Sequence, residues 1–356
     1  MKVSIDGGWV PHFEEALSRA RREIEMCRRL VARDGCPCLS HKGREVIRNH
    51  ITGVLAYGLN CWGERLKFKT TRDRVLAVDL RLEKVLLGLP CSANPELASL
   101  LSDRKSTIYE KVCSRFAAAS VKGISPSRKW WEKVVGCPPP DDNLVDVIST
   151  GGPFIAKSSI HIGSGDEIGT SLEHGLTRGR EIFPGIEAVI YTDGSRIPAS
   201  KVTKERVGCG FYSSSRGIGY GRMKLPSYSN IAQAEAAAIL SAVKKVIQTG
   251  SFSSVLIASD SQAVLKGLLA KKKTRLLCDL LEAVSRSDVN FYFIWVRGHA
   301  GCAGNSIADG MARSGAEMGT AFAAPIPESF IRNMVSDAMK TRFPQGTSLR
   351  VEDGKI

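Results

Sequence analysis

Four acidic side chains in the C-terminal half of the chain stand where a carboxylate is costly to bury. They are Asp193, Glu235, Asp260 and Asp309. Asp193 ends the apolar run AVIYT and Asp260 ends the apolar run SVLIAS, and such runs are typical of buried strands. Asp-Gly is also the commonest short turn signal, so Asp193 taken alone fits an ordinary turn.

The chemistry that suits converging carboxylates is binding of divalent cations. A charged carboxylate facing a core costs several kcal/mol unless hydrogen bonds or cations compensate, and four together repel one another. Carboxylate oxygens prefer Mg²⁺, for which Mn²⁺ can substitute, and two ions ~4 Å apart can bracket a phosphate for in-line displacement. The four acids are therefore predicted to bind two Mg²⁺ ions.

The elements around these acids predict a mixed α/β domain. Glu235 lies four, eight and eleven residues before Ile239, Val243 and Val246, so it shares the inward face of a helix. Two Gly-punctuated hairpin strands precede that helix. Strands and helices then alternate. Between Asp260 and the strand NFYFIWV there is room for one helix, and a lysine triplet at residues 271–273 precedes that helix.

Four motifs in order carry a family resemblance. YTDGS, AQAEAAAI, SDSQAVL and VRGHAGCAGNSIAD closely resemble the type 1 RNase H domain, in the form found in reverse transcriptases of non-LTR retrotransposons. The resemblance spans residues 186–318. It implies an RNase H-like mixed five-stranded sheet with flanking helices, preceded here by a smaller all-helical domain.

The resemblance also implies roles for particular residues. The four acids would be the catalytic metal ligands, and His299 would assist proton transfer and product release. A solvated loop histidine is the alternative for His299. Gly194, Ser195, Gln262 and Asn305 would contact nucleic acid, although turn and cap chemistry explains these four equally well.

The implied activity is endonucleolytic hydrolysis of the RNA strand of an RNA–DNA hybrid by two metal ions, leaving 5′-phosphates. Recognition would depend on 2′-hydroxyl groups and hybrid shape, with little sequence specificity. Trp295 matches an aromatic residue of the family's last strand and is interpreted as core. One alternative is a decayed retroelement remnant that only binds nucleic acid. Another is a different nuclease or a transposase of the same broad fold.

Residues 1–140 are predicted to be helical and basic, with 25 Lys and Arg against 15 Asp and Glu. Apolar residues recur at helical spacing from Phe13, Val46 and Val75. Their order, with Tyr57 and Trp62, resembles the thumb and connecting helices of such reverse transcriptases. The chain has no Tyr-X-Asp-Asp motif, so we expect no polymerisation. We expect a C-terminal piece of a retroelement polyprotein whose basic helices follow a nucleic-acid backbone.

The rest of the chain gives weaker signals. Residues 141–185 are rich in acid, Gly, Ser and Pro and are predicted to be a linker, and residues 319–356 to be a tail with one helix. With no 18-residue apolar span and no secretory signal, we expect a cytoplasmic or nuclear protein that is neither secreted nor membrane-bound. We expect reduced cysteines and no small-molecule cofactor. Cys36, Cys38 and His41 fit a loop better than a zinc site.

Overall fold

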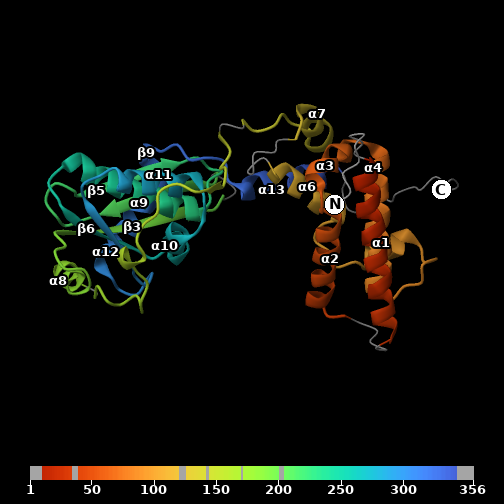
Figure 1. Cartoon of the computed structure of the whole chain (residues 1–356), viewed down its shortest axis with the longest axis horizontal. Coiled ribbons are helices and arrows are strands. Elements are labelled where there is room, and N and C mark those ends of the chain that lie inside the picture. Colours follow the sequence, from red (N-terminus) through yellow and green to blue (C-terminus); the bar gives the residue numbers. More distant parts are fainter. Residues whose placement is uncertain are drawn as a thin grey trace. The chain divides into compact units, whose positions relative to one another are not determined.

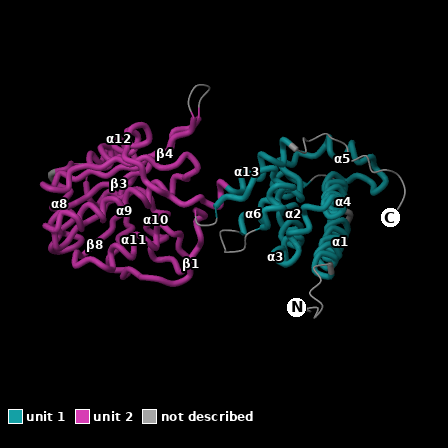
Figure 2. Tube along the Cα trace, turned by 90° about the horizontal axis from the view of Figure 1, so that it is seen from above, with its two compact units in different colours: residues 1–143, 331–356 teal, residues 144–330 magenta. Residues whose placement is uncertain are grey.

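The chain forms two compact units in a computed structural model that describes residues 10–33, 39–119, 126–141, 144–169, 171–199 and 204–342. Unit 1 comprises residues 1–143 and 331–356, and unit 2 comprises residues 144–330 (Figure 2). No helix in the described part of the chain combines the length and the apolar character needed to cross a bilayer.

Unit 1 is helical in its described residues, as the sequence predicts (Figure 1). Its longer helices are α1 (Val10–Arg33), α2 (His41–Leu55), α4 (Lys69–Leu86), α5 (Pro95–Leu101) and α6 (Ile108–Ala117). Its short helical turns are Leu59–Trp62, Gly63–Lys67, Arg128–Trp130 and Trp131–Val135. Helix α1 packs against both α2 and α4, and the fully buried Trp62 anchors this core beside Phe13, with 5.1 Å between the ring centroids.

The C-terminal helix α13 (Glu328–Arg342) completes the core of unit 1. Ile331, Val335 and Met339, spaced by four residues, are fully buried. The Ser114 hydroxyl of α6 also donates to the Arg332 carbonyl at 3.4 Å. The chain therefore leaves the helical unit, forms unit 2, and returns to the helical unit at its end.

Unit 2 is built on a seven-stranded sheet with the order β2-β8-β6-β3-β4-β5-β9. The strands are β2 (Ile160–His161), β3 (Ala188–Ile197), β4 (Arg206–Tyr212), β5 (Tyr220–Leu225), β6 (Ser254–Ser259), β8 (Asn290–Trp295) and β9 (Thr320–Ala321). β3 pairs antiparallel with β4 and parallel with β6, which pairs parallel with β8. The five longer strands form the predicted mixed sheet, and β2 and β9 add two residues each at its edges. Separately, β1 (Ser149–Thr150) pairs with β7 (Lys272–Lys273).

Helices cover both faces of this sheet. Alternate residues of β3 point to opposite cores, with Ile190 under α9 (Ile231–Thr249) and α11 (Arg275–Ser285), and Val189 on the face of α8 (Leu172–Ile182) and α12 (Ala303–Met318). Both faces are buried, which explains why the strands read as continuous apolar runs instead of alternating patterns.

The prediction of one helix between Asp260 and β8 is wrong, because the chain forms two. Helix α10 (Gln262–Leu269) precedes α11, and the lysine triplet lies between them. Helix α10 is too short to show clear periodicity in the sequence. Lys273 is buried, with its ammonium group donating to the Ala270 carbonyl at 2.6 Å and lying 4.3 Å from the centre of the Phe154 ring.

Residues 144–185, most of the segment predicted to be a linker, lie in unit 2. Val145 forms a parallel bridge with Ile326, β2 extends the sheet next to β8, and Ile168 and Phe183 are buried in the core under α8 and α12. The segment thus contributes core residues and a sheet edge to unit 2.

Helix α12 packs on β4 and β5 through glycines. A Cβ atom at Gly208 would lie 2.1 Å from the Ala316 amide nitrogen, and one at Gly315 would lie 2.7 Å from the Met223 carbonyl oxygen. Such close approach of two backbones needs residues without side chains. The position of α12, which carries Asp309, is therefore fixed by backbone contact.

Two glycines on α12 provide a matched test of this packing. We expect Gly315→Ala to lower the free energy of unfolding by about 1–3 kcal/mol, because the methyl group overpacks the contact with the sheet. Gly310→Ala has nothing within 4 Å of the new Cβ. It should raise stability by up to ~1 kcal/mol through helix propensity alone. Calorimetry on both variants checks the difference, and equal stabilisation by both would contradict the packing.

Candidate metal and active site

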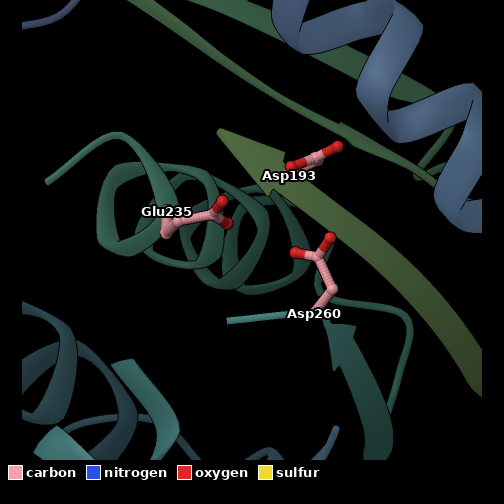
Figure 3. A group of neighbouring side chains, drawn as sticks. All are labelled: Asp193, Glu235 and Asp260. Carbon is pink, nitrogen blue, oxygen red and sulfur yellow. The ribbon is translucent and has the colours of Figure 1, made fainter. Parts of the chain in front are cut away.

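Three of the four predicted acids converge in unit 2. One carboxylate oxygen from each of Asp193, Glu235 and Asp260 lies within 4.8 Å of the others (Figure 3). They come from β3, from α9 and from the residue directly after β6. Asp193 and Glu235 are buried, and Asp260 is half-buried.

The position of Glu235 follows from how α9 begins. The Asn230 side chain accepts from the Gln233 amide, and the Gln233 side chain accepts from the Asn230 amide, which fixes the first turn. A Cβ atom at Gly194 would lie only 2.7 Å from the Glu235 amide nitrogen. Strand and helix therefore touch through their backbones beside Asp193, which brings the two carboxylates together.

Asp260 is held from two directions. The Trp295 indole donates to its carbonyl oxygen at 3.0 Å, and the Asn305 side chain on α12 hydrogen-bonds its carboxylate. Asn305 is 5% exposed and its Oδ1 atom has no hydrogen-bond partner. The structure thus places Asn305, a predicted nucleic-acid contact, beneath Asp260. Its spacing of four residues before Asp309 signals that both occupy one face of α12.

Burial and mutual repulsion raise the pKa values of the three acids. Burial is the larger cause for Asp193, Glu235 and Asp260, and the charges of neighbouring acids add to it. His299 opposes the shift at Asp260, where it favours the ionised form. The Oε2 atom of Glu235 is buried without a hydrogen-bond partner.

In the described part of the chain, the oxygens that lie within 4.8 Å of one another come from Asp193, Glu235 and Asp260, and not from Asp309. Its charge raises the pKa values of Asp193 and Asp260, so its carboxylate is close enough to repel theirs. Arg313, one turn further along α12, pairs with it at 2.8 Å. Arg313 therefore offsets part of the charge of the fourth predicted ligand.

The remaining predicted site residues lie around the group. His299 is exposed on a turn and has a left-handed backbone, with φ 55°. Ser195 lies on β3 opposite Gly208. Gln262 is the first residue of α10 and accepts from the Lys266 ammonium group at 2.8 Å.

The structure gives no further information on a zinc site at Cys36, Cys38 and His41. Cys36 and Cys38 lie outside the described residues. His41 begins α2, where its ring lies 3.8 Å from the Asp103 carboxylate.

The residues present fit a hard divalent cation. Carboxylates with raised pKa values and an unpartnered buried oxygen need positive charge, and oxygen ligands of this kind bind such ions. Asp193, Glu235 and Asp260 would hold the ion, with Asp309 beside them.

A family model matches the part of the chain that carries these acids. Residues 186–317 match the family model described as RNase H, so this segment is an RNase H domain within an RNase H-like fold. Among curated proteins nothing matched.

Several solved structures match a little over a third of the chain at low identity. RNase H1 from the halophilic archaeon Halobacterium salinarum NRC-1 is 18% identical, with 36% of this chain and 96% of that chain covered and a TM-score of 0.27. The N-terminal RNase H domain of a Mycobacterium tuberculosis protein is 14% identical, with 37% and 95% covered and a TM-score of 0.30. LC9-RNase H1, a type 1 RNase H with the type 2 active-site motif, is 18% identical, with 36% and 71% covered and a TM-score of 0.29.

The raised pKa values predict how pH and divalent ions affect stability. Between the unfolded and the folded pKa the folded protein binds more protons, so the free energy of unfolding of metal-free protein should fall as pH rises from 5 to 8. We expect a loss on the order of 1 kcal/mol or more. Mg²⁺ should raise the unfolding temperature more at pH 8 than at pH 5.

Calorimetry at both pH values, with Mg²⁺ or with chelator, measures these changes. Glu235→Gln serves as the comparison, because it removes one of the shifted groups and should flatten the pH dependence. A metal-free protein that becomes more stable towards pH 8 would contradict the electrostatic account.

Proposed function

We propose that the protein is a Mg²⁺-dependent endonuclease that hydrolyses the RNA strand of RNA–DNA hybrids and leaves 5′-phosphates. The observation that carries this proposal is the largely buried group of Asp193, Glu235 and Asp260 inside the segment that matches the RNase H family model. Two ions would occupy the site, and Mn²⁺ would substitute for Mg²⁺. The resemblance of the motifs to retrotransposon enzymes supports a retroelement origin.

Each residue of the site would have its own role in hydrolysis. Asp193, Glu235 and Asp260, with Asp309 beside them, would hold the ions, which would supply activation of a water molecule and stabilisation of the leaving 3′ oxygen. Asn305 orients the Asp260 carboxylate through its hydrogen bond. Within the site, burial excludes water and strengthens every charge interaction.

His299 is suited to move a proton at the edge of the site. It is exposed, and it follows Gly298, where a Cβ atom would lie 2.7 Å from Asp260 Oδ2. An imidazole can both donate and accept a proton, so His299 could donate to the leaving oxygen or accept from water. Its turn also gives the ring access to solvent after cleavage.

Contacts to the hybrid would come from the surface around the acids. Gly194 and Ser195 are half-buried on β3, where a backbone can approach a phosphate or a 2′-hydroxyl group. Gln262 presents its side chain at the start of α10, beside Asp260. Contacts of this kind recognise hybrid shape and give little base specificity.

The substitution Asp193→Asn tests the proposal directly. Cleavage of a labelled RNA–DNA hybrid should fall by at least about 10³-fold, because the change removes an ion ligand and a charge. Hybrid affinity, measured without divalent ions, should stay equal or increase as negative charge is lost. Asp288→Asn, at an exposed position outside the site, is the matched control and should cleave normally.

The outcomes separate the rival functions. Wild-type protein that binds hybrid but leaves both strands intact, with Mg²⁺ present, would favour the decayed binding remnant. Cleavage of the DNA strand would favour another nuclease of the same fold. Undiminished RNA cleavage by the Asp193→Asn variant would remove Asp193 from the mechanism.

We also propose that unit 1 binds a nucleic-acid backbone through its basic helices. Between α1 and α2 lies an open groove of about 610 Å³, with Arg19, Arg22, Asn49, His50 and the exposed Tyr57 in its lining. The excess of Lys and Arg over residues 1–140 favours a polyphosphate partner. Glu15 lies within 3.7 Å of both arginines, so bound phosphate would compete with its carboxylate.

The double variant Arg19→Ala/Arg22→Ala tests the groove. Each arginine that neutralises a phosphate contributes about 0.9 to the slope of log affinity against log salt, so the slope should become about two units shallower. The value of kcat should not change. Arg178→Ala/Arg286→Ala removes the same charge from unit 2, where each arginine pairs with a glutamate of its own helix. Equal effects of both double variants would argue against a specific groove.

A further inference from the structure

We propose that the loop of residues 163–167, called the 163–167 loop, positions two parts of the catalytic site. This loop lies outside residues 186–317, the segment that matches the family model. One part is Asp260, reached through Trp295. The other is the turn that carries His299, reached through Arg297. The effect on cleavage rests on the proposed function, whereas the contacts of the loop are independent of it.

Sheet topology puts this loop at the edge where the site lies. β2 pairs parallel with β8, with Ile160 opposite Phe293 and His161 opposite Ile294. Parallel strands end at the same edge of a sheet. The residues that follow β2 therefore lie beside those that follow β8, at the edge where Asp260 follows β6.

The first contact joins Gly165 to Asp260. Gly165 has φ +89°, and a Cβ atom there would lie 2.8 Å from Trp295 Cζ3. The backbone of the loop thus lies directly against the indole ring. The same indole donates to the Asp260 carbonyl oxygen at 3.0 Å. A shift of the loop would therefore move the ring that holds the backbone of a metal ligand.

The second contact joins the loop to the His299 turn. The Arg297 amide donates to the Gly165 carbonyl at 2.9 Å, and its guanidinium group donates to the Ser164 carbonyl at 3.3 Å. Asp166 lies 3.5 Å from the same guanidinium group. Arg297 is two residues before His299, so the turn starts from a residue that the loop holds at both its backbone and its side chain.

The loop has a shape of its own that makes it a firm support. The Glu167 carboxylate accepts from the Ser164 amide at 2.6 Å and from the Gly165 amide at 2.8 Å, and it lies 3.4 Å from His161 Nε2. Burial alone would raise the pKa of Glu167, but these N–H groups outweigh it and lower the pKa. The ionised side chain thereby closes the loop upon itself.

Two glycines of the same segment allow a matched experiment in the full chain. Gly165→Ala and Gly169→Ala both place a side chain at positive φ, +89° and +75°, so both strain the backbone. Only at Gly165 would the new Cβ meet Trp295 and Arg297, since nothing lies within 4 Å at Gly169. A difference between the two variants therefore reports the contacts of the loop.

We expect Gly165→Ala to increase amide hydrogen exchange in residues 296–301 and to weaken Mn²⁺ binding by about tenfold, as loss of a support behind a metal ligand does. In cleavage assays kcat should fall by about tenfold with little change in KM. Gly169→Ala should match wild type in exchange, Mn²⁺ affinity and kcat. Mn²⁺ binding is measured by electron paramagnetic resonance.

Trp295→Phe provides a second route if Gly165→Ala does not fold. It keeps a ring against Gly165 but removes the donor to Asp260, so it should weaken Mn²⁺ binding without increasing exchange in residues 296–301. Wild-type exchange and Mn²⁺ affinity in Gly165→Ala, or wild-type Mn²⁺ affinity in Trp295→Phe, would overturn the proposal. Failure of the proposed function would instead appear as absence of RNA cleavage by the wild-type protein.

Discussion

The structure of unit 2 depends on holding three carboxylates together against their repulsion. Asp193, Glu235 and Asp260 lie within 4.8 Å of one another in a largely buried setting, and no lysine or arginine in the described part of the chain forms an ion pair with them. In the described part of the chain, His299 is the cationic side chain that favours an ionised acid of this group, and it acts on Asp260 alone. Protonation supplies positive charge to the group in the metal-free state, and divalent ions would supply it in the active state.

The backbone, more than the side chains, enforces this convergence. Gly194 lets β3 touch the first turn of α9, and glycines on β4 and α12 let that helix lie directly on the sheet. Contacts between backbones leave little freedom to relax, so repulsion between the acids cannot simply push the elements apart. The repulsion between the acids therefore lowers the free energy of unfolding, and such a loss of stability is common at functional sites.

Three of the four acids that the sequence singles out lie close together, and each of the three stands at a strong local signal, while their role as metal ligands stays a prediction. Asp193 follows an apolar run and lies within β3, which continues to Ile197, whereas Asp260 directly follows β6. Glu235 lies on the inward face of a helix whose cap is visible as Asn230. Residues 144–185 give no such signal. Their order comes from distant contacts, such as two residues of β2 on β8 and Gly165 on Trp295, which composition does not encode.

Two further features depend on distant contacts that the sequence pattern does not specify. Helix α13 is visible in the sequence, but its packing in unit 1 depends on partners more than 200 residues away, such as Ser114. The burial of Asn305 under Asp260 depends on how α12 crosses the sheet. Periodicity predicts an element and its apolar face, whereas the choice of partner is set by the tertiary structure.

The separation of Asp309 from the other acids follows from the same electrostatics. A fourth carboxylate within the group would add repulsion that burial makes stronger, and the chain avoids part of it by pairing Asp309 with Arg313 at 2.8 Å. Arg313 is largely exposed, so releasing it to solvent costs little once another cation takes its place. Two buried acids and the half-buried Asp260 therefore lie near a fourth carboxylate that an exposed arginine holds and that an arriving cation would release.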